Sequence, residues 1–112
     1  MTDTLQRECL EEIDTRVEIR DMIAVADFLK QRSTVPEMRR HVMEFLFLCH
    51  LPAHYHPHNG PHPDKHQVDV VWMPMEQMDQ IRLFPQYLSR CIPAYQDPNR
   101  PVYLGIHRDE GF

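Results

Sequence analysis

The stretch that most constrains the fold lies near the start of the chain, where Arg7-Glu8-Cys9-Leu10-Glu11-Glu12 places three glutamates within five positions. In a helix, side chains three and four positions apart lie on the same side, so Glu8, Glu11 and Glu12 would share one face. The opposite face would carry an apolar set made of Leu5, Cys9, Leu10 and Ile13. We therefore predict an amphipathic helix that docks its apolar face on a core.

The acidic face of this helix has two possible interpretations, a metal-binding site and a solvated surface. Like charges four residues apart cost about 0.2–0.5 kcal/mol per pair in an isolated helix, and a hard divalent cation would reverse that cost. Magnesium prefers carboxylate oxygens, so glutamates on one face can hold it against the phosphates of a substrate. The alternative is a solvated acidic face in which Arg7 pairs with Glu11. The spacing leaves both open.

Composition is typical of a soluble globular protein with one domain. The chain has 112 residues, of which 42% are hydrophobic and 26% charged, which suffices for a buried core. Its net charge of −5 gives no electrostatic reason to bind nucleic acid or an anionic membrane. The chain shows no signal peptide and no apolar run long enough to cross a membrane, so we expect a cytoplasmic location.

The three cysteines are Cys9, Cys49 and Cys91. They lie far apart and form no CxxC pair, which argues against a zinc or redox site. Each has apolar neighbours, so we interpret them as buried thiols in a reducing compartment.

Apolar patterning after the acidic helix predicts strands and one interrupted helix. The expected strands cover residues 17–29, 41–51, 66–74 and 102–106, and a loop is expected over 31–39. A helix from Met75 to Cys91 would be broken at Pro85. Trp72 is expected in the core because its neighbours are apolar, and the alternative is that it stacks on a ligand. Glu44 would face either water at an edge or a metal site.

The segment 52–65 combines four histidines with four prolines. Because the prolines prevent a regular helix or strand, this composition predicts a long surface loop. Those histidines are His54, His56, His58 and His62. Histidines at alternate positions can chelate a transition metal, which makes a zinc or nickel site one hypothesis. The other is a substrate-facing loop in which a histidine or Tyr55 stacks on a base.

The acidic stretch resembles the second half of the Nudix box. In that box a glycine, five residues, a glutamate and seven more residues precede Arg-Glu-U-x-Glu-Glu-x-Gly-U, where U is a bulky apolar residue. Arg7, Glu8, Glu11 and Glu12 match this pattern, and Cys9 fills the first U position. The rest of the chain from residue 17 to 104 is similar to the remainder of a Nudix domain.

Two features depart from the family pattern. Asp14 replaces the glycine of the box, and aspartate tolerates positive φ better than most residues. The second departure is that the first glycine and first glutamate of the box, with the strands that open the domain, would fall ahead of Met1. We therefore expect an N-terminally truncated domain.

The start of the acidic helix is predicted from a local signal. Asp3 can act as N-cap, with Gln6 three positions later in a variant of the capping box.

The resemblance implies an α/β fold, a Nudix-like α/β/α sandwich with a mixed sheet, in a single partial domain over residues 1–112. It implies a magnesium-dependent, or manganese-dependent, hydrolase that cleaves the diphosphate linkage of nucleoside diphosphate derivatives. Glu8, Glu11 and Glu12 would be the metal ligands, Glu11 or Glu12 would orient or deprotonate water, and Arg7 would hold the carboxylates in register. The alternative is a catalytically silent domain that binds a nucleotide or a protein. An uncovered sheet edge would favour a homodimer.

Overall fold

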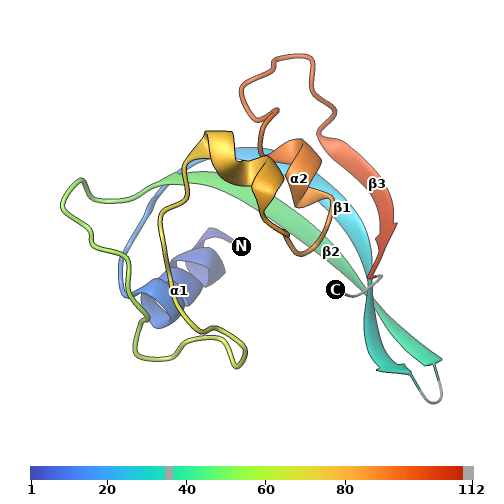
Figure 1. Ribbon diagram of the computed structural model, residues 1–112, viewed down its shortest axis with the longest axis horizontal. Coiled ribbons are helices and arrows are strands. Elements are labelled where there is room, and N and C mark those ends of the chain that lie inside the picture. Colours follow the sequence, from blue (N-terminus) through green and yellow to red (C-terminus); the bar gives the residue numbers. More distant parts are fainter. Residues whose placement is uncertain (35–36, 110–112) are drawn as a thin grey trace. The chain divides into compact units, whose positions relative to one another are not determined.

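The structure of the protein is a computed structural model, which describes residues 1–34 and 37–109 (Figure 1). Its elements in order are α1 (Thr2–Ile13), β1 (Glu18–Thr34), β2 (Glu37–His50), the 3-10 helix η1 (Met75–Gln80), α2 (Leu88–Cys91) and β3 (Tyr103–Arg108). They form two compact units. The helix unit comprises Met1–Asp21 and Leu48–Pro74, and the sheet unit comprises Met22–Phe47 and Met75–Phe112.

A mixed three-stranded sheet has the strand order β2-β1-β3. β2 runs antiparallel to its neighbour β1, whereas β3 pairs with β1 in parallel, with Phe28 opposite His107 (Figure 1). The sheet register shifts between Val25 and Asp27. The predicted α/β class with a mixed sheet is confirmed.

Asp27 links the three strands through its carboxylate. It accepts hydrogen bonds from Tyr103 Oη of β3 at 2.5 Å and from His41 Nε2 of β2 at 2.6 Å. The bond from Tyr103, followed by the bond from His41, lowers the pKa of Asp27. The side chains that face one another across the sheet therefore help to fix its register.

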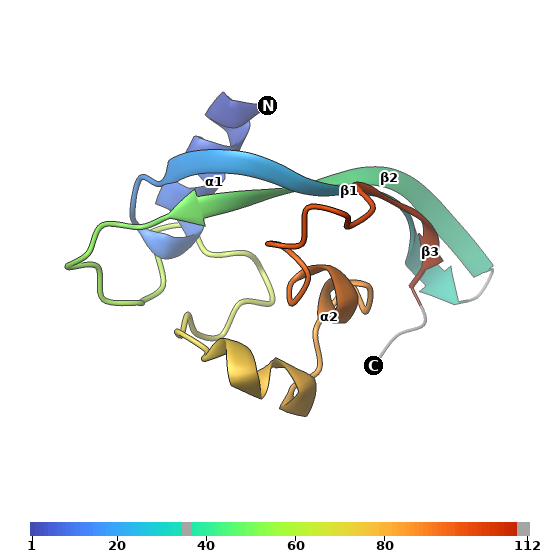
Figure 2. The ribbon, with the colours of Figure 1, turned by 90° about the horizontal axis from the view of Figure 1, so that it is seen from above.

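The core of the sheet unit forms around β1, whose residues Ala24, Ala26 and Phe28 are buried because alternate side chains share one face of a strand. Phe28 packs edge-to-face on Phe84 and Tyr87, with ring centroids 5.7 and 6.1 Å apart. Figure 2 shows η1 and α2 on one face of this sheet. Phe84 and Tyr87, which come just before α2, therefore pack against the apolar side of β1.

Tyr87 also ties this core to β2, because its hydroxyl donates a hydrogen bond to Glu44 Oε1. Burial, followed by this bond, raises the pKa of Tyr87, so the phenol stays protonated and remains a donor. Glu44 is half-buried, and its carboxylate contacts a core tyrosine. Neither of the two settings expected for Glu44, water or a metal site, describes this contact.

We expect Tyr87→Phe to lower the free energy of unfolding by about 1 kcal/mol, because it removes this hydrogen bond and keeps the ring that packs on Phe28. Urea denaturation of both proteins measures the difference. Equal stability would mean that the bond to Glu44 contributes nothing.

Two expectations about secondary structure were wrong, and a third was confirmed only in part. Residues 66–74 form no strand in the described chain, and Trp72 is 64% exposed, because no neighbouring strand satisfies this segment's backbone. The predicted loop over 31–39 is strand at 31–34 and 37–39, while residues 35 and 36 lie outside the described residues. The helix expected from Met75 to Cys91 is two short helices, η1 and α2, with Pro85 between them as predicted.

Candidate functional site

The acidic helix forms where it was predicted, over Thr2–Ile13, and it ends at Asp14 with φ 59° and ψ 39°. This left-handed conformation is the one that the box glycine would supply, and aspartate adopts it here. The predicted N-cap is wrong, because Asp3 lies inside the helix and Met1 takes the cap position without a side-chain bond. Gln6 instead forms a pair of hydrogen bonds with the backbone of Val17.

The C-terminal end of α1 is closed by the histidine-rich loop. Gly60 N donates to Glu12 O at 2.9 Å, and His62 N donates to Glu11 O at 2.8 Å. The last carbonyls of a helix lack partners within it, so these bonds supply the missing donors. A methyl group on Gly60 would lie 2.4 Å from Glu11 O, so the close approach requires glycine.

Two side chains of the same segment add to this closure. Tyr55 Oη donates to Ile13 O at 2.6 Å, and Gln67 Nε2 donates to Glu12 O at 2.7 Å. Gln67 Nε2 also donates to Asn59 Oδ1 at 2.9 Å, which links the middle of the loop to the residues that follow it. The predicted surface loop therefore caps α1, and it is held there by Tyr55 and by Gln67, a residue that the sequence analysis did not single out.

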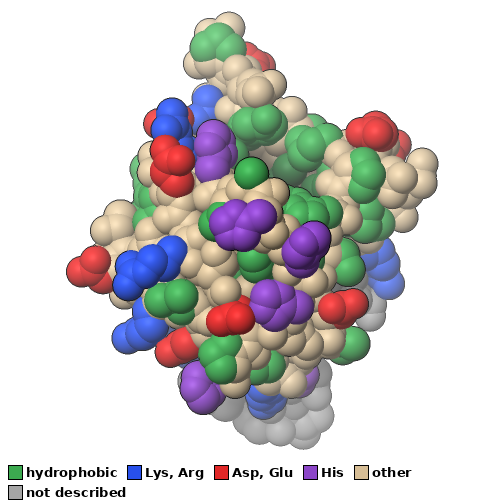
Figure 3. Space-filling model, turned by 90° about the vertical axis from the view of Figure 1, so that its left-hand side faces the viewer, with side chains coloured by type: hydrophobic (Ala, Val, Ile, Leu, Met, Phe, Trp, Pro, Cys, Tyr) green, Lys and Arg blue, Asp and Glu red, His purple; other side chains and the backbone are tan. Residues whose placement is uncertain are grey.

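Figure 3 faces the side of the molecule that carries this loop and shows histidine side chains gathered there with carboxylates beside them. The four histidines of the loop are all exposed. Across the described residues, no three histidine, cysteine, aspartate or glutamate side chains converge as metal ligands would. The zinc or nickel hypothesis therefore gains no support from the geometry.

One of these histidines pairs with the helix end. His58 Nε2 lies 3.0 Å from Asp14 Oδ2, and His58 Nδ1 lies 2.6 Å from His56 O. The hydrogen bond to Asp14, followed by that to the His56 carbonyl, raises the pKa of His58. Its ring also lies beside that of Tyr55, with centroids 5.6 Å apart. Protonation of His58 therefore strengthens the attachment of the loop to α1.

We expect this pair to make stability depend on pH. The folded-state pKa of His58 is raised, so the stabilising contribution is fully present below the unfolded value of about 6.5 and is lost as pH rises through the folded pKa. Asp14→Asn keeps a residue that tolerates positive φ and removes the charge. NMR titration of the Asp14→Asn variant should give His58 a lower pKa than it has in the unchanged protein. The unfolding midpoint of the unchanged protein should fall as pH rises through the folded-state pKa of His58, and the midpoint of the variant should not show this fall. An unchanged His58 pKa would contradict the pairing.

The glutamates of α1 differ in their surroundings. Glu8 is exposed, whereas Glu11 and Glu12 are half-buried. Burial, followed by the charges of Glu8, Asp64 and Glu11, raises the pKa of Glu12. Asp64 was missed by sequence reasoning, because only the attachment of the loop to α1 brings it near the helix. The crowding of four carboxylates is the electrostatic signature of this site.

The same carboxylates are candidate ligands for magnesium. Their oxygens are the donors that magnesium prefers, so the set fits the ion chemically. The described side chains do not converge on one point. The ion pair considered between Arg7 and Glu11 is also absent among the described residues, and Arg7 is exposed.

Comparison with known proteins identifies the family. Residues 1–95 match the family model described as the NUDIX domain. The chain belongs to the Nudix family. No curated protein and no solved structure gives a significant match. Nudix domains in general indicate hydrolases of nucleoside diphosphate derivatives, which agrees with the acidic helix. Within the described part of this Nudix chain, no helix is long and apolar enough to cross a membrane.

The thiols of the Nudix domain were expected to be buried, and they are so to different degrees. Cys91 is buried, whereas Cys9 and Cys49 are half-buried, and none of the three forms a disulfide bond. Burial, followed by the charges of Cys49, Glu12 and Glu8, raises the pKa of Cys9, so its thiol stays protonated. A protonated thiol is a poor nucleophile, which leaves the carboxylates as the reactive groups of α1.

Proposed function

We propose that this protein is a magnesium-dependent hydrolase that cleaves the diphosphate linkage of nucleoside diphosphate derivatives on the acidic face of α1. The observation that carries the proposal is the crowding of the Glu8, Glu11, Glu12 and Asp64 carboxylates at α1, in a chain of the Nudix family. Burial and these neighbouring charges raise the pKa of Glu12. A cation between these groups would relieve their mutual repulsion. Manganese, with similar oxygen preference, would serve as a substitute.

Each residue of the site has a proposed role. Glu8, Glu11 and Glu12 would hold the ion, which when bound supplies charge neutralisation at the phosphates and a more acidic water. Glu12 is half-buried, and its raised pKa brings it closer to that of a general base that works near neutral pH. Arg7, exposed on the same helix, would keep the carboxylates in register through a charge-assisted hydrogen bond.

The loop over α1 would select the substrate. Its attachment to the carbonyls of Glu11 and Glu12 keeps it beside the acidic helix. Tyr55 and His58 present two neighbouring rings that are suited to stacking on a base.

Turnover of a panel of nucleoside diphosphate derivatives, followed by phosphorus NMR with and without magnesium, tests the proposal. We expect magnesium-dependent release of a nucleoside monophosphate and a second phosphorylated product. If the folded protein binds members of the panel without cleaving any of them, the silent, binding-only domain replaces the hydrolase. Cleavage that is independent of any divalent ion would also overturn the proposed mechanism.

We further propose that the 112 residues act as one domain and that the protein works in the reducing environment of the cytoplasm. We also propose that copies of the chain associate. Three cysteines without a disulfide bond support the compartment. Val68, Val71 and Trp72 are 87%, 63% and 64% exposed, and β2 and β3 are the outer strands of the sheet. Exposed apolar side chains and strand edges recruit other chains. Light scattering should show a mass that rises with concentration, and a constant monomer mass would contradict association.

A further inference from the structure

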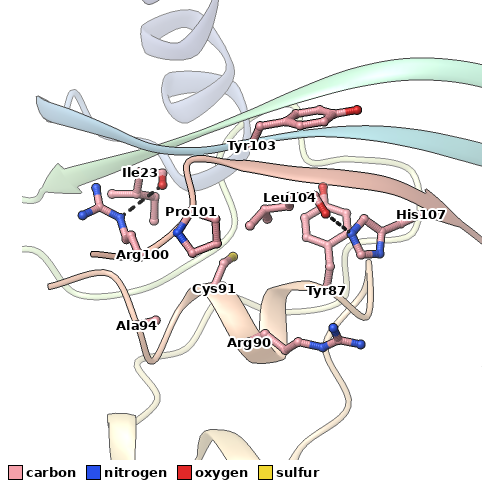
Figure 4. A pocket seen from close by; sticks show the side chains of 10 residues that line it. All are labelled: Ile23, Tyr87, Arg90, Cys91, Ala94, Arg100, Pro101, Tyr103, Leu104 and His107. Atoms are coloured by element: carbon pink, nitrogen blue, oxygen red, sulfur yellow. Dashed lines mark hydrogen bonds between the residues drawn. The ribbon is translucent and has the colours of Figure 1, made fainter. Parts of the chain in front are cut away.

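The sheet unit contains a hollow to which no residue of α1 contributes. It lies between α2 and the β1 and β3 strands and encloses about 240 Å³. Its inner wall is mostly apolar and includes Ile23, Cys91, Ala94, Pro101 and Leu104. Figure 4 shows the Cys91 sulfur pointing from α2 into this space toward Pro101 and Leu104. Burial raises the pKa of the Cys91 thiol, so the group acts as an apolar wall and not as a nucleophile.

Tyr87 and His107 form a rigid aromatic side to the hollow. Their ring centroids are 5.0 Å apart with an interplanar angle of 44°. His107 Nε2 donates to Leu104 O at 2.8 Å, which fixes the imidazole plane (Figure 4). At the other end, Arg100 Nε donates to Ile23 O at 3.3 Å (Figure 4). The walls are therefore held in place before any ligand binds.

A second, polar hollow of about 460 Å³ adjoins the first and shares Tyr87, Arg90 and His107 with it. Arg108 adds another guanidinium to its lining, and Gln86 and Ser89 add neutral polar groups. Within residues 1–34 and 37–109, neither Arg90 nor Arg108 forms an ion pair with a carboxylate. Two unpaired guanidinium groups in an acidic chain mark this mouth as a place for an anion.

We propose that these two hollows bind a phosphate monoester with a flat, apolar body. The body would occupy the inner hollow beside Tyr87 and His107, and the doubly charged phosphate would lie at the mouth between Arg90 and Arg108. One guanidinium group can bind two phosphate oxygens at once. Two such groups favour a doubly charged phosphate over an anion with a single charge. The binding requires no divalent ion and no residue of α1, so it is separate from the proposed catalytic reaction.

Calorimetric titration with adenosine monophosphate in the presence of EDTA tests this site. We expect binding to weaken roughly tenfold in Arg90→Ala and in Arg108→Ala, because each removes a charge-assisted hydrogen bond. Arg40→Ala, which removes an exposed arginine of β2 outside both hollows, should bind as the unchanged protein does. Absence of binding, or equal binding by Arg90→Ala, would overturn the proposal.

Two further arms separate the body from the phosphate. Ala94→Phe fills the inner hollow, so it should weaken the binding of adenosine monophosphate and leave that of inorganic phosphate unchanged. Adenosine without phosphate should bind more weakly than its monophosphate, and equal binding would overturn the phosphate contact. Glu12→Gln should bind adenosine monophosphate normally. Loss of binding in that variant would instead place the ligand on α1. If the protein proves not to be a hydrolase, adenosine monophosphate should still bind at the two hollows, so the two proposals fail independently.

Discussion

Replacing Glu12 with glutamine should lower turnover by at least about 100-fold, the scale on which general acid–base groups contribute. Glutamine has nearly the same shape but cannot accept a proton at neutral pH, and it weakens the set of oxygen ligands. The backbone carbonyl of residue 12, which binds Gly60 and Gln67, is unaffected. Steady-state kinetics with magnesium on the best substrate of the panel measures the effect.

Stability separates this loss from misfolding. The raised pKa of Glu12 means that its ionised form costs folding free energy above the ordinary glutamate pKa. Glu12→Gln should therefore unfold at the same temperature as the unchanged protein or a higher one. Glu18→Gln is the matched control, because Glu18 is exposed and pairs with Arg20 at 2.6 Å, away from the Glu12 carboxylate. Full activity in Glu12→Gln would exclude the proposed role.

Gly60→Ala should destabilise the protein by about 1–3 kcal/mol, the usual cost of overfilling a packed site. The added methyl group would lie 2.4 Å from Glu11 O and 2.9 Å from Asp14 N, and both are backbone atoms that cannot rotate away. The loop must withdraw from α1, which breaks the hydrogen bond from Gly60 N to Glu12 O. Turnover should fall as well, because Asp64 and the Tyr55 ring depend on this attachment. Urea denaturation and the activity assay measure both effects.

Gly105→Ala is the control for a purely conformational cost. Gly105 has φ +88°, and no atom lies within 4 Å of the position that an added methyl group would take, so alanine meets backbone strain but no collision. We expect a loss of about 1 kcal/mol without any change in turnover at α1. A Gly60→Ala protein with unchanged stability and activity would show that the loop does not close the helix as described.

The acidic helix could be predicted because its signals are local. The spacing of Glu8, Glu11 and Glu12 and the aspartate after Ile13 specify a helix and its left-handed end without reference to the rest of the chain. The predicted N-cap, Asp3, lies inside the helix, and Gln6, its predicted capping-box partner, forms hydrogen bonds with Val17 instead. A tertiary partner eleven residues away overrode the local motif.

Residues whose position depends on distant contacts could not be predicted. Asp64 reaches the site only because Gly60 and His62 bind the carbonyls of α1. The segment 66–74 has the alternation of a strand, but a strand also needs a partner with free backbone groups, and none of the described strands pairs with it. Trp72 is exposed for the same reason.

The most direct test of the metal site is a titration of the protein with manganese, followed by the electron paramagnetic resonance signal of the free ion. Manganese substitutes for magnesium at oxygen ligands and is observed without any substrate. We predict that the unchanged protein and Glu18→Gln take up the ion, that Glu12→Gln binds it roughly tenfold more weakly, and that magnesium competes. Equal uptake by Glu12→Gln, or no uptake by the folded protein, would contradict the claim that the glutamates of α1 hold the metal.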